Sequence, residues 1–228
     1  MPFFDTTYLI YVMPFILLAM YAQYKVNSNY NQYSQVRNSK DMTGAQAARI
    51  ILDRNNLQHV AVLKTAGVLS DHYDPRKQTI SLSSGVYDNP SISAISIAAH
   101  EVGHAIQHDK SYVPLKIRSL MAPVVSVASN FVWIFIVIGF IISPIFVDIG
   151  IAIFIGVLLF QLVTLPVEFN ASSRAIKELE NGLISIDEKS GAKKVLQAAA
   201  LTYIAATLVT VGQLARIFSL SGRRNNRR

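Results

Sequence analysis

His100, Glu101 and His104 form an HExxH pattern, and no other residues in the chain are better placed to do chemistry. On a helix, two histidines four residues apart leave the same face one turn apart, so both imidazoles can reach one Zn²⁺ ion. The glutamate sits beside the metal without binding it, where it can take a proton from the attacking water and return it to a leaving amine. The pattern predicts a zinc hydrolase with two histidine ligands and Glu101 as general base, then general acid.

The sequence around this motif favours a buried helix. We expect Asn89 as the N-cap and Pro90 as the first helical residue. An apolar stripe at three- and four-residue steps follows, made of Ile95, Ala99, Val102 and Ile106. A chance match on a core helix is the alternative, and the capped start and apolar flanks argue against it.

A catalytic zinc ion needs a third protein ligand, and because the chain has no cysteine this must be a histidine or a carboxylate. His108 lies eight residues after His100, about 12 Å along one helix, and is too far away. His72, in a sequence with turn character, is one candidate. Glu168 is the better candidate, because an intervening membrane hairpin would return the chain to the side of the motif. We expect Glu168 at the start of the helix that follows the hairpin.

Composition indicates a membrane protein: 51% of the 228 residues are hydrophobic and 15% are charged. The net charge of +7 fits membrane topology and contact with lipid headgroups. No motif of basic and aromatic residues supports nucleic-acid binding, so we expect no nucleic-acid partner. The absence of cysteine excludes disulfides and thiolate zinc sites.

The predicted fold is mainly α: a polytopic membrane helical protein with a small zincin-like α+β domain that carries the HExxH helix. Five segments follow from the changes in polarity: an uncleaved N-terminal anchor helix (1–24), the zincin-like domain (25–118), a transmembrane hairpin (119–165), a helix with the third ligand (166–194), and a fourth apolar helix with a disordered basic tail (195–228). Pro14 should kink the anchor, a polar linker or loose helix should follow from Asn27, and the hairpin should turn at Ser143–Pro144.

Inside the zincin-like domain we expect a helix over 43–55, strands over 60–64 and 78–83, and a turn over 71–75. The strand just before the motif helix would suit a sheet edge to which an extended peptide substrate adds. Because most Lys and Arg residues lie in segments 25–118 and 166–194, the positive-inside rule places both segments in the cytoplasm. The C-terminal arginines would lie outside if the fourth run spans, and the sequence leaves that conflict open.

Five stretches resemble the YugP family of neutral zinc metallopeptidases of bacterial membranes: 70–75, 82–83, 86–87, the motif at 98–107, and 166–172. The resemblance covers essentially the whole chain and implies a multi-pass zinc peptidase of the plasma membrane. There is a looser likeness to HtpX-type and CAAX-prenyl endopeptidases, in which an Asp follows the ligand Glu by four residues. Here Ser172 occupies that position, where it could hydrogen-bond a zinc ligand, and Asp71 or Asp74 could supply the missing carboxylate. His72 of the same turn is a further candidate for a supporting contact, and Arg174 is a candidate for oxyanion stabilisation.

The predicted function is a zinc-dependent endopeptidase that cleaves membrane or membrane-associated proteins, with Zn²⁺ as cofactor. Its partners would be a peptide or protein substrate, the lipid bilayer and other membrane proteins. The alternatives are a zinc-binding membrane scaffold without turnover, which would have no use for Glu101, and a transporter or channel. Asp148 alone is charged within the predicted spans, which argues against transport.

Overall fold

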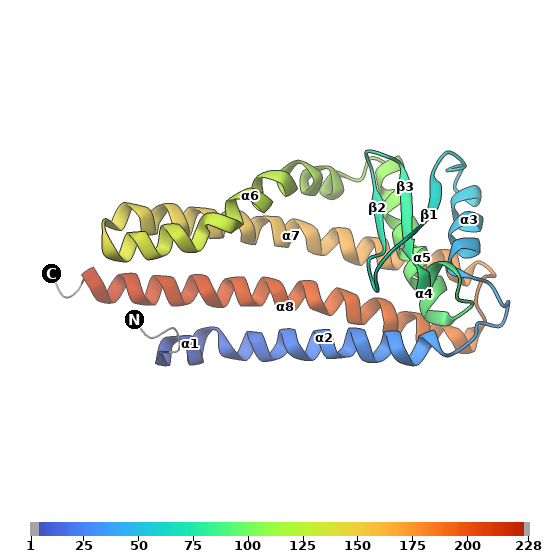
Figure 1. Cartoon of the computed structure of the whole chain (residues 1–228), viewed down its shortest axis with the longest axis horizontal. Helices are drawn as coiled ribbons and strands as arrows, with labels where there is room; N and C mark the ends of the chain where they lie inside the picture. Colours follow the sequence, from blue (N-terminus) through green and yellow to red (C-terminus); the bar gives the residue numbers. More distant parts are fainter. Residues whose placement is uncertain (1–4, 226–228) are drawn as a thin grey trace. The chain divides into compact units, whose positions relative to one another are not determined.

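The structure is a computed structural model that describes residues 5–225. The protein is mainly helical with one small three-stranded sheet (Figure 1), as the sequence predicts. The chain divides into two compact units. Among the described residues, the helical unit contains 5–22, Lys116–Leu165 and 202–225, and the α/β unit contains Gln23–Leu115 and Pro166–Leu201.

The α/β unit contains the sheet and the helices around it. In chain order its complete elements are α3 (Gly44–Arg54), β1 (Ala61–Thr65), β2 (His72–Asp74), β3 (Thr79–Ser83), α4 (Ser84–Tyr87) and α5 (Ile92–Asp109). Thr43 caps α3 in a capping box with Gln46, because each side chain bonds the other residue's backbone N–H. The predicted helix and the two predicted strands are therefore present.

The sheet has the order β1-β3-β2, with β1 parallel and β2 antiparallel to β3. The predicted turn over 71–75 is wrong in part, since His72–Asp74 pairs with Thr79–Ser81 as a strand. The prediction that the strand before the motif helix forms a sheet edge is also wrong. That strand, β3, lies in the middle, and the edges are β1 and β2. Turn-forming residues dominate the local sequence here, whereas the pairing of β2 depends on contacts that the local sequence does not specify.

Helix α5 carries the HExxH residues and begins two residues later than predicted. Ser91 is its N-cap, and the Ser91 side chain accepts a hydrogen bond from the Ala94 N–H at 3.2 Å. The predicted cap at Asn89–Pro90 is wrong because this segment is extended: the Pro90 carbonyl accepts from the Asn38 N–H, and Ser91 forms an isolated bridge with Arg37.

The core of the α/β unit surrounds α5. The predicted stripe is buried, with Ile95, Ala99, Val102 and Ile106 all at most 4% exposed. Around it pack Ile51 and Leu52 of α3, Ile80 and Leu82 of β3, and Ala175 and Leu179 of α7 (Pro144–Glu180). Because such close-packed surroundings resist displacement, the motif helix is held firmly in place.

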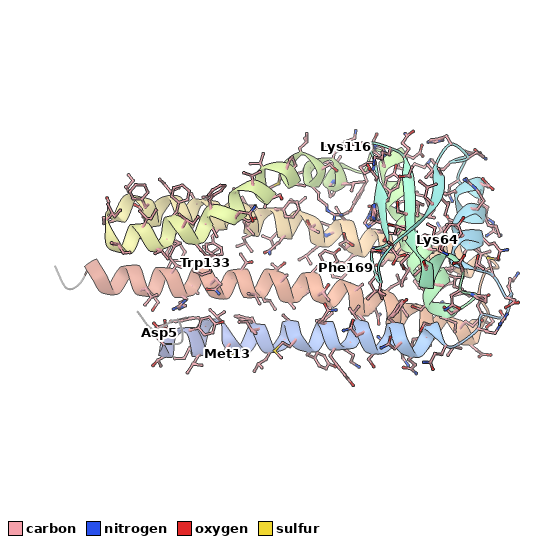
Figure 2. All side chains as sticks on the ribbon, viewed as in Figure 1. Asp5, Met13, Lys64, Lys116, Trp133 and Phe169 are labelled. Carbon is pink, nitrogen blue, oxygen red and sulfur yellow. The ribbon has the colours of Figure 1, made fainter. Side chains whose placement is uncertain are left out.

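The helical unit contains α1 (Thr6–Tyr11), most of α6 (Val113–Ile141), and parts of α2 (Met13–Ser34), α7 and α8 (Ile186–Asn225). Within the part of the chain that the structure describes, three helical segments are long and apolar enough to cross a membrane: Val113–Gly139, Pro144–Glu180 and Ile186–Leu220. The predicted turn at Ser143 separates the first two. Trp133, labelled in Figure 2, meets Phe154 edge to face with ring centroids 5.5 Å apart, which joins α6 to α7.

Helix α7 runs without interruption through Pro166, so the prediction of a new helix from residue 166 is wrong. Glu168 therefore lies inside a helix and not at its start. Proline removes one helical hydrogen bond, a loss that membrane helices tolerate when neighbouring groups compensate. Helix α7 ends at Glu180, and Gly182 follows with a left-handed φ of +85°, as is common just after a helix.

Both ends of the chain differ from the prediction. The expected single N-terminal helix is divided at Val12 into α1 and α2, and α2 continues to Ser34 through most of the expected linker. The anchor role of residues 1–24 stays a prediction, because α2 is not one of the three membrane-length helices found among the described residues. At the other end α8 continues to Asn225, so the basic tail begins as helix, and residues 226–228 lie outside the described part.

Candidate metal centre

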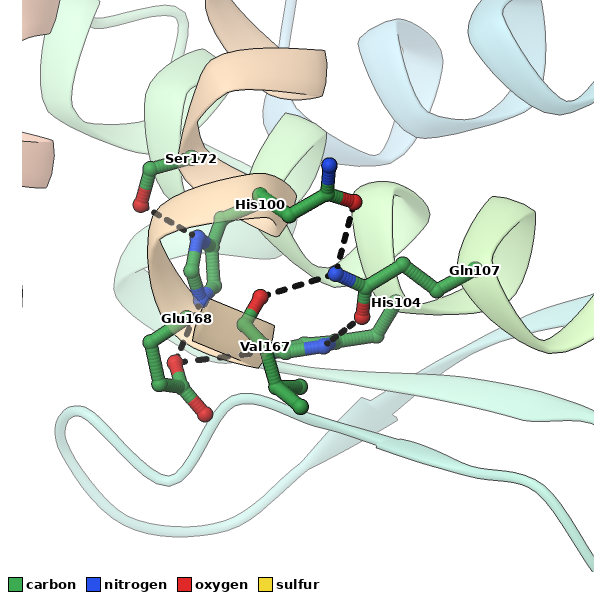
Figure 3. Close-up of polar contacts among 7 residues, drawn as sticks. His100, His104, Gln107, Val167, Glu168 and Ser172 are labelled. Atoms are coloured by element: carbon green, nitrogen blue, oxygen red, sulfur yellow. Dashed lines mark hydrogen bonds and ion pairs between the residues drawn. The ribbon is translucent and has the colours of Figure 1, made fainter. Parts of the chain in front are cut away.

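Three donor atoms from two helices meet in the α/β unit. His100 and His104 project from α5, and both imidazole Nε2 atoms approach one carboxylate oxygen of Glu168 on α7 (Figure 3). The distances from Glu168 Oε2 are 3.2 Å to His100 Nε2 and 3.7 Å to His104 Nε2. The donor atoms of the three residues all lie within 4.8 Å of one another.

These residues fit zinc in chemistry and in spacing. Two N or O ligands at about 2 Å in a tetrahedron are separated by about 3.3 Å, close to the 3.2 Å and 3.7 Å that separate Glu168 Oε2 from the two histidine nitrogens. Two histidines and one glutamate form a known catalytic zinc set that leaves a fourth position open. The cluster is largely enclosed, with Glu168 3% exposed and His104 9% exposed.

A glycine inside the motif allows α5 and α7 to approach closely. A Cβ placed on Gly103 would lie 2.6 Å from the carbonyl oxygen of Ala171 and 3.2 Å from its Cα. Both neighbours are backbone atoms of α7, so a side chain at residue 103 would push the two helices apart. Gly103 therefore sets the separation at which Glu168 meets the two histidines.

The second nitrogen of each histidine also has a neighbour. His100 Nδ1 lies 3.2 Å from Ser172 Oγ, and His104 Nδ1 lies 3.0 Å from Gln107 Oε1. Such contacts on the far side of an imidazole orient the ring and select the nitrogen that carries the proton. Ser172 thus lies where the sequence suggested a group that orients a zinc ligand.

The electrostatics of the site favour a positive charge in the cluster. Burial opposes protonation of His104, but the hydrogen bond to Glu168, the charges of Glu101 and Glu168, and the Gln107 contact together raise the pKa of His104 above its ordinary value. Glu101, only 8% exposed, is close enough for its charge to act on His104. The same negative charges would stabilise a cation bound in the cluster.

The other residues singled out in the sequence have hydrogen-bond partners outside the three donors. Asp71 accepts hydrogen bonds from the backbone and side chain of Ser83, and His72 Nδ1 contacts the Ser70 carbonyl. His108 Nδ1 lies 2.9 Å from the Tyr73 hydroxyl. None of the three belongs to the cluster of potential metal-binding groups found among the described residues.

Arg174 is linked to the site through Asn170 and Gln107. Its Nε donates to Asn170 Oδ1 at 2.8 Å, and Asn170 Oδ1 in turn accepts from Gln107 Nε2. The sequence reasoning missed Gln107 and Asn170. The available signal was spacing, since Gln107 follows His104 by three residues and so shares its side of the helix.

Two histidines and one glutamate, brought together from two helices, form a cluster that could hold a metal ion, with the ligand types found in mononuclear zinc hydrolases. The comparisons with known proteins agree: residues 8–222 match the family described as "Putative neutral zinc metallopeptidase", and the chain belongs to that family. The chain is 47% identical over 213 residues to "Putative membrane protease YugP" of Bacillus subtilis (strain 168), covering 92% of this chain and 95% of that protein. The resemblance predicted from the sequence is therefore confirmed. No solved structure matches the chain significantly.

Proposed function

We propose that the protein is a zinc-dependent, multi-pass membrane endopeptidase that hydrolyses peptide bonds of membrane or membrane-associated proteins. The observation that carries this proposal is that the donor atoms of His100, His104 and Glu168 lie within 4.8 Å of one another, with the charge of Glu101 acting on His104. The family and the relative's name support a protease role and a membrane location.

In this proposal His100, His104 and Glu168 hold the metal. When bound there, zinc would supply Lewis-acid chemistry: it would polarise the scissile carbonyl and lower the pKa of the attacking water. Glu101 follows His100 directly on α5 and is not needed as a ligand. Its carboxylate accepts the proton of the attacking water and then delivers that proton to the nitrogen of the leaving amine. Ser172 orients the His100 ring.

The membrane assignment rests on the three apolar helices. A hairpin of α6 and α7 crosses the bilayer twice, so it returns the chain to the side from which it started. Both segments of the α/β unit are then on one side, and they hold most of the 21 Lys and Arg residues. By the positive-inside rule that side is the cytoplasm of a bacterial plasma membrane. If α8 also spans, the C-terminus lies on the opposite side.

The change that tests this function is Glu101→Gln, which removes the base but keeps the size of the side chain. The purified variant should retain its zinc and lose hydrolysis of a fluorescently labelled unfolded protein by about 100- to 10,000-fold, the usual contribution of general acid–base catalysis. Loss of zinc would contradict the role given to Glu101. A wild-type protein that holds zinc yet cleaves neither soluble nor membrane-embedded substrates would favour the scaffold alternative.

A further inference from the structure

Gln107 is a buried amide whose hydrogen bonds all lead to the metal site or to the helix that carries Glu168. Its side chain is on α5 and is 0% exposed. Its Oε1 lies 3.0 Å from His104 Nδ1, and its Nε2 lies 2.8 Å from the Val167 carbonyl oxygen and 3.0 Å from Asn170 Oδ1 (Figure 3). The mechanism above does not use this residue.

The neighbours of Gln107 determine which way its amide points. The Val167 carbonyl can only accept a hydrogen bond. Asn170 Oδ1 also acts as an acceptor, because Arg174 Nε donates to it at 2.8 Å. A flipped amide would place its oxygen against two other oxygens in a buried site, which costs the full desolvation penalty of unpaired polar groups. The Gln107 NH₂ group therefore faces α7, and Oε1 faces His104.

This orientation has a consequence for His104. Oε1 of an amide accepts but cannot donate, so His104 Nδ1 must carry a proton to make the contact. A neutral imidazole with its proton on Nδ1 has a lone pair on Nε2, the atom that points toward Glu168 and the metal position. Ser172 does not determine which nitrogen of His100 carries the proton, because a hydroxyl can either donate or accept.

We propose that Gln107 is a positioning residue that holds His104 in the Nδ1–H tautomer and ties its ring to α7 beside Glu168. Without Gln107, the Glu168 carboxylate would draw the proton to His104 Nε2, which cannot then bind a metal. Since Val167 directly precedes Glu168, one side chain fixes both the imidazole and the backbone next to the carboxylate. The value of this tautomer for zinc binding rests on the proposed function, whereas the tautomer itself does not.

The test is ¹⁵N NMR of imidazole-labelled, zinc-free protein in detergent at alkaline pH, where the histidines are neutral. In the wild type, the His104 signals should be those of the Nδ1–H tautomer. In Gln107→Met, which keeps the length of the side chain but removes the amide, the proton should shift to Nε2. Gln107→Glu should keep the Nδ1–H tautomer, because a carboxylate still accepts from His104. Gln107→Glu should also melt at a lower temperature than the wild type, because it loses the two hydrogen bonds that the Gln107 NH₂ group donates to Val167 and Asn170 of α7.

The matched control is Asn38→Met. Asn38 is also a buried amide, 4% exposed, but its hydrogen bonds go only to the backbone of Met42. This variant should be destabilised without any change at His104. A wild-type His104 that carries its proton on Nε2, or a tautomer unchanged in Gln107→Met, would overturn the proposal.

Zinc titration separates this proposal from the proposed function. Gln107→Met should raise the zinc Kd by about 10- to 100-fold, as the loss of such supporting contacts does elsewhere, whereas Asn38→Met should leave the Kd unchanged. If the wild type bound no zinc, the proposed function would fail, but the tautomer measurement would still decide the role of Gln107.

Discussion

Replacing Gly103 with alanine should damage the metal site although alanine is the better helix former. The change removes a glycine from the interior of α5, which alone should stabilise that helix by about 1 kcal/mol. However, the new Cβ would lie 2.6 Å from the Ala171 carbonyl oxygen. Relaxing this contact to the roughly 3.3 Å of the closest C–H···O contacts requires a shift of about 0.7 Å between α5 and α7. Zinc ligand distances tolerate only about 0.2 Å.

Isothermal titration of the purified variant with zinc would measure this effect. We expect the Kd of Gly103→Ala to rise at least about tenfold, because Glu168, one turn before Ala171 on α7, is carried away from the histidines. Gly156→Ala is the matched control, since it makes the same change inside α7 and its Cβ would meet nothing within 4 Å. A Gly103→Ala protein that bound zinc as tightly as the control would refute the argument that this glycine sets the helix separation.

Zinc binding and topology give two further predictions. Zinc affinity should increase as the pH rises through the raised pKa of His104, because the ligand must be neutral. The folding stability of the zinc-free protein should instead fall as the pH rises. The pKa of His104 is higher in the folded than in the unfolded chain, so its contribution to stability is complete below the unfolded pKa. That contribution is lost as the pH rises through the folded pKa. Thermal melts with and without zinc across this pH range would detect both trends, and a zinc affinity independent of pH would contradict the first. A cysteine in place of the exposed Ser84, unique in a chain without cysteine, should react with a membrane-impermeant thiol reagent in inverted vesicles and not in whole cells; the reverse pattern would place the α/β unit outside.

The sequence was sufficient wherever a local pattern determined the structure. The four-residue spacing of His100 and His104 on an apolar stripe predicted two imidazoles on one helix face. The length of the apolar runs predicted the hairpin of α6 and α7. The approach of Glu168 to the histidines followed from that hairpin, although the helix that carries it does not start where predicted.

Features that depend on contacts between residues far apart in the sequence could not be predicted from local patterns. His72–Asp74 looks like a turn because Asp and Pro surround it, yet it pairs with β3. Pro166 looks like a helix start, yet α7 continues through it. Gln107 was missed because its three-residue spacing from His104 shows only that both share one side of the helix, and its importance comes from Val167 and Asn170 on another helix.

The zinc content of Glu168→Ala tests the central claim most directly. Elemental analysis of the purified wild type should find one zinc ion per chain, and Glu168→Ala should lose zinc and hydrolysis together, with an affinity at least about tenfold lower. Glu178→Ala, a change on the same helix at a carboxylate that contacts Asn55, should keep both zinc and activity. If Glu168→Ala kept full zinc and full activity while His72→Ala lost both, the third ligand would be His72 and the proposed centre between α5 and α7 would be wrong.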